Sequence, residues 1–157
     1  KPENKAKRKE YDSKPEVKAK IKEYNQRPEV MAKAKEVRDR PEFKAKKKKE
    51  RGSIRLEVLQ TYSKRLSNSD IPCCNCCNLN SHLDFLAIDH IAGKKQMDSE
   101  PELVKLGYSS KLDGMDLVNW LILNDFPKGF QILCHNCNRA KGMPKNNNEC
   151  PMKNKPH

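Results

Sequence analysis

Hydrophobic residues are unevenly distributed along this chain, and their spacing divides it into two parts. Residues 1–51 carry few large apolar side chains, too few to bury a core. Beyond Ser53, apolar residues recur at helical spacing or form short continuous runs, which is typical of a folded domain. The pattern predicts a polar arm followed by a compact part.

Two segments of the compact part have the apolar spacing of amphipathic helices. The first begins after Gly52, with Ser53 as its N-cap, and the second covers Asp113–Asn124. We expect Trp120, in the second segment, to pack in the core rather than to stack on a base. The residues expected on the apolar faces are Ile54, Val58, Leu59, Tyr62 and Leu66 in the first helix, and Met115, Val118, Leu121 and Ile122 in the second.

Two short apolar runs, Phe85–Ile91 and Phe130–Leu133, predict β-strands. A short helical segment, Asn138–Lys141, follows the second run and ends at Gly142. Residues 97–112 are mixed in character and receive no assignment. Strands and helices of this order predict an α+β fold for the compact part.

A 13-residue repeat organises the arm. Pro-Glu recurs at this interval, at Pro2-Glu3, Pro15-Glu16, Pro28-Glu29 and Pro41-Glu42. Proline suits the first position of a helix, and glutamate suits its positive N-terminal end. Because proline disfavours helical geometry in the preceding residue, Lys14, Arg27 and Arg40 are expected in joints between short helices. A kinked continuous helix is the alternative, and we expect the arm alone to be marginally helical or disordered and to order on a duplex.

Charge is concentrated in the arm. Residues 1–51 hold 20 Lys/Arg and 10 Asp/Glu, a net +10, whereas the other 106 residues hold 13 and 11, a net +2. A basic arm on a nearly neutral body indicates a polyanionic partner, most often nucleic acid, although a charged tail that only aids solubility is the alternative. The lysines that keep the repeat and are expected to contact phosphates are Lys7, Lys20, Lys33 and Lys46.

Four cysteines occur as two Cys-x-x-Cys pairs, the spacing of a tetrahedral Zn²⁺ site. The four are Cys74, Cys77, Cys134 and Cys137. Cys73-x-x-Cys76 is an alternative first pair, but Asn78 after Cys77 suits the left-handed turn of a knuckle. A closed site of four thiolates leaves no position for chemistry, so this zinc would be structural. Reduced core cysteines and redox chemistry are the other interpretations, and Cys150 receives no role.

An Asp-His dipeptide ends the first predicted strand. Closing the zinc site would bring Asp89 and His90 close to Asn138, which follows Cys137. The Asp89 carboxylate and the Asn138 amide would together hold one Mg²⁺ or another divalent ion. His90 would then take a proton from water as a general base. This set suits a metal-dependent phosphodiesterase, and a purely structural Asp-His pair is the alternative.

These motifs resemble those of the HNH endonucleases, the ββα-metal or His-Me finger family. The resemblance covers roughly residues 54–142 and is carried by Cys74-x-x-Cys77, Leu86-Ala87-Ile88-Asp89-His90-Ile91 and Gly129-Phe130-Gln131-Ile132-Leu133-Cys134-x-x-Cys137-Asn138-x-x-Lys141-Gly142. It implies a small zinc-stapled finger with flanking helices that hydrolyses double-stranded DNA. In that resemblance His90 matches the base, while Asp89 and Asn138 match the ligands of the divalent ion.

The sequence departs from the family at one position. Many members have a bracing asparagine where this chain has Gly129, and Asn119, Asn124 and Asn136 are the candidates to replace it. Four further basic residues lie near the expected site and are expected to contact phosphates. They are Arg139, Lys141, Lys94 and Lys95.

We therefore expect an arm at 1–51, a nuclease domain at 52–142 and a tail at 143–157. No apolar run is long enough for a membrane span, and paired thiols without a secretory signal favour a reducing intracellular compartment. The resemblance also implies a phage or mobile-element context. The rival hypotheses are a non-catalytic zinc-ribbon protein that binds DNA or RNA and a structural protein that compacts nucleic acid.

Overall fold

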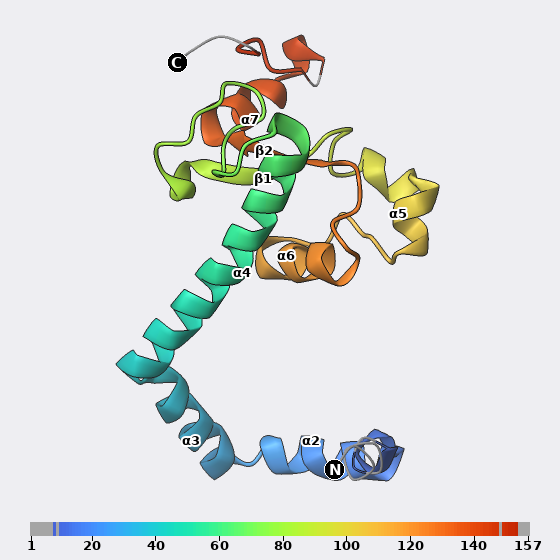
Figure 1. Cartoon of the computed structure of the whole chain (residues 1–157). Helices are drawn as coiled ribbons and strands as arrows, with labels where there is room; N and C mark the ends of the chain where they lie inside the picture. The colour runs from blue at the N-terminus through green and yellow to red at the C-terminus, as the bar shows by residue number, and fades with distance from the viewer. Residues whose placement is uncertain (1–7, 9, 148, 154–157) are drawn as a thin grey trace. The chain divides into compact units, whose positions relative to one another are not determined.

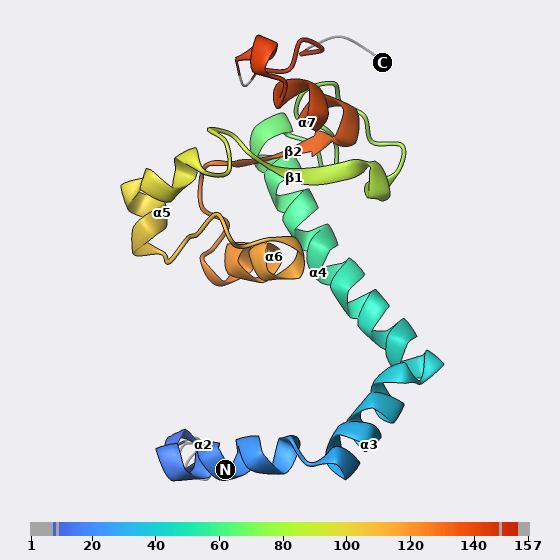
Figure 2. The ribbon, with the colours of Figure 1, turned by 180° about the vertical axis from the view of Figure 1, so that it is seen from behind.

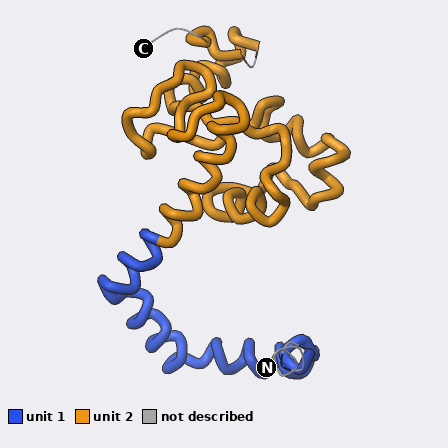
Figure 3. The backbone as a smooth tube through the Cα atoms, viewed as in Figure 1, with its two compact units in different colours: residues 1–49 blue, residues 50–157 orange. Residues whose placement is uncertain are grey.

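The computed structural model describes residues 8, 10–147 and 149–153. Its internal contacts divide the chain into two compact units, residues 1–49 and residues 50–157, coloured separately in Figure 3. This division lies close to the boundary expected after residue 51. Within the described ranges, no helix is both long and apolar enough to cross a membrane.

The first unit contains the short helices that the repeat predicts. Helix α2 (Pro15–Asn25) and helix α3 (Pro28–Asp39) each begin with proline at the first turn, and neither contains a buried residue. The joint residues Lys14 and Arg27 have extended backbones, with ψ of 137° and 134°. The predicted pattern of helix, joint and helix is therefore confirmed for α2 and α3, which bury no side chain in a core.

Helix α4 (Pro41–Ser67) corrects one prediction. A helix start at Ser53 is wrong, because α4 continues without a break through Gly52 and Ser53. Glycine inside a helix costs only about 1 kcal/mol relative to alanine, less than the burial of a large side chain contributes. Of the expected apolar face, Val58, Leu59 and Tyr62 are buried and Ile54 is partly buried, whereas Leu66 is exposed.

The second unit is built on a small antiparallel hairpin. Strand β1 (Leu86–His90) pairs with strand β2 (Phe130–Cys134), and the register sets Asp89 opposite Gln131 and His90 opposite Phe130. Helix α7 (His135–Lys141) begins directly after β2, and Figures 1 and 2 show it against the hairpin. The fold is thus α+β, mostly helical with one two-stranded sheet.

The segment between the strands packs as a helical layer. It contains a 3₁₀ turn η2 (Gln96–Ser99), helix α5 (Pro101–Lys105) and helix α6 (Gly114–Leu123). The Trp120 indole donates to Leu106 O at 3.0 Å, and the side chain is buried, which confirms its packing role. Two further 3₁₀ turns, η1 (Leu83–Phe85) and η3 (Pro144–Asn146), precede β1 and follow α7.

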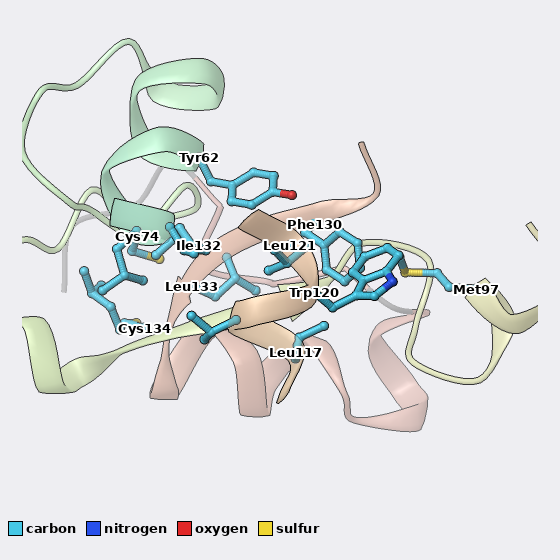
Figure 4. Close-up of a cluster of buried hydrophobic side chains, with 14 of the residues drawn as sticks. Tyr62, Cys74, Met97, Leu117, Trp120, Leu121, Phe130, Ile132, Leu133 and Cys134 are labelled. Carbon is cyan, nitrogen blue, oxygen red and sulfur yellow. The ribbon is translucent and has the colours of Figure 1, made fainter. Parts of the chain in front are cut away.

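Aromatic side chains form the centre of the core. Figure 4 shows Phe130 of β2 between Tyr62 of α4 and Trp120 of α6, with ring centroids 6.3 Å and 5.9 Å from Phe130. The Tyr62 hydroxyl donates to Pro127 O at 2.7 Å, and burial raises its pKa far above the usual value. Tyr62 therefore ties α4 to the chain that enters β2.

Candidate metal centre and active site

The four cysteines that the spacing selected come together. The sulfur atoms of Cys74, Cys77, Cys134 and Cys137 all lie within 4.8 Å of one another, and none forms a disulfide. The Cys77 and Cys134 sulfurs are 3.8 Å apart. A Zn–S bond of about 2.3 Å gives a tetrahedral edge of about 3.8 Å, so this set fits zinc. The cluster can therefore hold a metal ion such as zinc.

Backbone turns and one asparagine set the geometry of the first knuckle. Asn78 has a φ of 60°, and its N–H donates to Cys74 O at 2.9 Å. Asn75 exchanges two bonds with Ile132: its N–H donates to Ile132 O at 2.7 Å, and its Oδ1 accepts from Ile132 N at 2.6 Å. The knuckle is therefore docked on β2, so its sulfurs meet those at the end of that strand.

Cys73 does not join this set. Its backbone N–H and C=O are both bonded to the Ser63 hydroxyl, at 3.0 Å and 3.3 Å. Its sulfur is not among those that gather with Cys134 and Cys137, so the alternative pair Cys73 and Cys76 does not close this site. Burial raises the pKa of the Cys77 thiol to about 11, so a metal ion must displace a proton from this sulfur at neutral pH.

Asp89 is buried in a network that the sequence did not reveal. Its Oδ2 accepts from Lys141 Nζ at 2.6 Å and from Gln131 Nε2 at 2.7 Å. Lys141 Nζ also donates to His90 O at 2.6 Å. Lys141 is only 5% exposed, so its expected contact with phosphate is wrong: its charge balances Asp89 instead.

His90 lies at the edge of the aromatic core. Its ring centroid is 5.1 Å from that of Phe130 and 6.0 Å from that of Tyr108. Nε2 is buried and has no hydrogen-bond partner within the described part of the chain. Burial lowers the pKa of His90; the Asp89 charge opposes this shift, and Lys94 and Lys141 reinforce it. The ring is therefore neutral at pH 7.

Asn138 lies one helical turn before Lys141 on α7. Residues three apart share a helix face, so Asn138 lies on the side of α7 from which Lys141 reaches Asp89. It is partly buried, and its side chain forms no hydrogen bond to any residue that the structure describes. The oxygen donors of Asp89 and Asn138 suit a hard divalent ion, although the Lys141 ammonium would repel one.

The other cations that were expected to contact phosphates, where the structure describes them, are solvent-facing. Lys94, Lys95 and Arg139 are exposed in the second unit. In the arm Lys20, Lys33 and Lys46 are exposed, and Lys7 lies outside the described residues. These six side chains are exposed, as a phosphate-binding role requires.

The backbone conformation at position 129 explains why this position holds glycine. It has a φ of 103°, and a Cβ added there would lie 2.9 Å from Met97 Cε, so any larger residue would be strained. Gly129 O accepts from Ile91 N at 2.9 Å, and the Tyr108 hydroxyl donates to Lys94 O at 3.2 Å. These two bonds brace the loop after His90.

None of the three candidate asparagines is seen to brace the loop after His90 in the described part of the chain. Asn124 donates to Trp120 O at 2.8 Å, within the end of its own helix. Asn119 and Asn136 are exposed.

A search of family models, curated proteins and solved structures finds no match to this chain.

Proposed function

We propose that this protein is a metal-dependent DNA endonuclease of the HNH type. The observation that supports it is the joining of the Asp89-His90 end of β1 to α7 by Lys141, next to four clustered cysteine sulfurs. A hairpin followed by a helix, with an acid, a histidine and an amide at their junction, suits hydrolysis of a phosphodiester.

His90 is the general base in this proposal. Of its two ring nitrogens, only Nε2 is enclosed without a partner in the described chain, so Nδ1 takes the proton from the attacking water. The lowered pKa keeps the ring neutral at pH 7 and hence able to accept that proton. Phe130 and Tyr108 hold the ring in place through tilted ring contacts.

Asp89 and Asn138 would hold the divalent ion. Both contacts to Asp89 are on Oδ2, which leaves Oδ1 as a ligand, and the Asn138 amide supplies a second oxygen. A bound divalent ion would supply positive charge to the scissile phosphate. Lys141 and Gln131 fix the orientation of the Asp89 carboxylate, while Lys94, Lys95 and Arg139 contact neighbouring phosphates.

A second candidate is a non-catalytic zinc-ribbon protein that binds DNA or RNA. The observation in its favour is the buried ion pair itself: Lys141 already neutralises Asp89 at 2.6 Å. On this alternative, Asp89 and His90 stabilise the junction of β1 with α7 and take no part in chemistry.

A plasmid-nicking assay separates the two. The wild type is expected to nick supercoiled DNA with Mg²⁺ or Mn²⁺ and to stop when chelator removes that ion. His90→Ala should lose roughly 10²–10⁴-fold in rate while binding DNA unchanged. His135→Ala is the matched control, because His135 is an exposed histidine of the same unit whose ring nitrogen is hydrogen-bonded to Asp84 O.

Two results would refute the endonuclease. One is nicking by His90→Ala at the wild-type rate. The other is tight DNA binding by the wild type with no nicking under any divalent ion, which would favour the zinc-ribbon alternative.

A further inference from the structure

A second group of sulfur atoms adjoins the first. The sulfurs of Cys76, Cys137 and Cys150 also lie within 4.8 Å of one another. Cys137 belongs to both groups, so six cysteines form one continuous cluster that shares a single sulfur. Cys150 was not expected there, because it lies outside both Cys-x-x-Cys pairs.

Local structure explains how these three sulfurs meet. Cys76 lies inside the first knuckle and is 6% exposed, and Cys137 lies in the first turn of α7 and is fully buried. After α7 the chain turns back through η3, where Asn146 Nδ2 donates to Ala140 O at 2.6 Å. This bond anchors the segment on α7, and Cys150 then packs against the core.

We propose that the chain binds a second thiophilic divalent ion, zinc or its substitute cadmium, on Cys76, Cys137 and Cys150, with the Cys137 sulfur bridging both ions. A thiolate sulfur has lone pairs enough to bind two such ions, and soft thiolates select them over Mg²⁺. Binding of the second ion releases the two thiol protons of Cys76 and Cys150 to solvent, and no electron is transferred.

Charge favours this arrangement. One Zn²⁺ with four thiolates carries a net charge of about −2, and adding Zn²⁺ with two more thiolates leaves that charge unchanged. The cationic side chain of Lys153 lines a cavity of about 350 Å³ that Cys76 and Cys150 also border. Its charge offsets part of that of the cluster.

The same cavity supplies the fourth ligand of the second ion. Glu149 lines it beside Cys150. A water molecule or the Glu149 carboxylate completes a tetrahedron with the three sulfurs. The inference is independent of the proposed nuclease activity, because no residue of the Asp89-His90 site is a ligand in it.

Metal stoichiometry tests the proposal on the full chain. Native mass spectrometry of reduced protein, after loading with excess zinc or cadmium and desalting, should show two ions per chain. Cys150→Ser and Cys76→Ser should each show one. Cys73→Ala is the matched control and should retain two, because Cys73 lies outside both sulfur groups. Cys150 follows α7 and η3 and is not one of the four cysteines of the first site, so its substitution leaves that site intact.

Cadmium NMR tests the bridge. Two resonances with scalar coupling between them are expected from the wild type, and one uncoupled resonance from Cys150→Ser. A single ion in the wild type, or two ions in Cys150→Ser, would overturn the proposal. A Cys76–Cys150 disulfide that persists in reductant, with one ion bound, would overturn it as well.

Discussion

Lys141 Nζ lies 2.6 Å from Asp89 Oδ2, and both residues are buried, at 5% and 8% exposure. The same ammonium donates to the carbonyl of His90. One side chain from α7 therefore binds two consecutive residues at the end of β1. The orientation of the Asp-His pair depends on this lysine.

Lys141→Met should destabilise the second unit by about 3–5 kcal/mol, because it leaves the Asp89 carboxylate buried without its cation. Urea unfolding measures this loss. Arg139→Met is the control and should change the free energy of unfolding by less than about 0.5 kcal/mol, since Arg139 is exposed on the same helix. Adding Asp89→Asn to Lys141→Met should recover part of the loss. If Lys141→Met and Arg139→Met were equally stable, the role of the Lys141–Asp89 pair would be contradicted.

Removal of metal from the four-cysteine cluster should unfold the second unit. Structural zinc contributes about 10–16 kcal/mol, as much as the whole stability of a typical domain. Trp120, the single tryptophan, is buried in this unit, so its fluorescence should shift to the red on chelation and return with zinc. Cys134→Ser should resemble the chelated protein, and Cys73→Ala the wild type. Unchanged fluorescence of the metal-free protein would show that zinc is not needed for the fold.

Tyr62→Phe should alter stability at high pH. The folded pKa of Tyr62 is raised by burial above the unfolded value of about 10, so its stabilising effect is complete below that pH and declines as pH rises beyond it. The variant should lose about 1–2 kcal/mol at neutral pH, because Pro127 O loses its donor, and should show a shallower alkaline decline. Urea unfolding against pH measures both effects. Tyr24→Phe, an exposed arm residue, should change neither.

The pKa of His90 should lie below its usual value of about 6.5, because burial disfavours the charged ring. Its folded pKa is depressed, so it contributes stability above the unfolded pKa that is lost as pH falls toward the folded one. NMR titration of the ring measures this directly, and the acid limb of any nicking profile should follow it. Lys94→Gln should raise the midpoint, whereas Lys95→Gln should not; a midpoint at or above 6.5 would contradict the burial of this ring.

The arm should bind DNA through its charges. Replacing Lys20, Lys33 and Lys46 by glutamine should reduce the slope of log affinity against log salt by up to about 3, with no change in preferred sequence. Replacing Glu16, Glu29 and Glu42 by glutamine is the control and should not reduce that slope, because it removes no cation. Filter binding at several salt concentrations measures the slope. An unchanged slope in the lysine variant would exclude the arm from the DNA contact.

Local chemistry explains which parts of the fold were predictable. Helices α2, α3 and α4 begin at Pro15, Pro28 and Pro41, as the repeat predicts. The Cys-x-x-Cys spacing selects the four clustered sulfurs. The short apolar run Phe130–Leu133 likewise predicts β2. The helix starts and β2 were predictable because the cause and the structure lie within one turn or one strand. The four sulfurs were predictable because each Cys-x-x-Cys pair marks its own half of the site.

Long-range pairs account for most of what the sequence did not reveal. Lys141 was expected to contact phosphate because it follows the expected metal ligand Asn138, whereas its partner Asp89 lies 52 positions away. Gln131 joins that network only through the register of β1 with β2. The continuity of α4 through Gly52 depends on the packing of residues further along the helix. Such pairings need the folded chain to identify them.

The two halves of the four-cysteine cluster are separated by 57 positions, from Cys77 to Cys134. At a synthesis rate of about 5–20 residues per second, the ribosome makes the second half roughly 3–11 s after the first. During that interval a nascent chain offers only half of the thiolates and binds zinc weakly. Maturation of the second unit must therefore await synthesis of the second pair of cysteines, and its yield should depend on zinc supply at that moment.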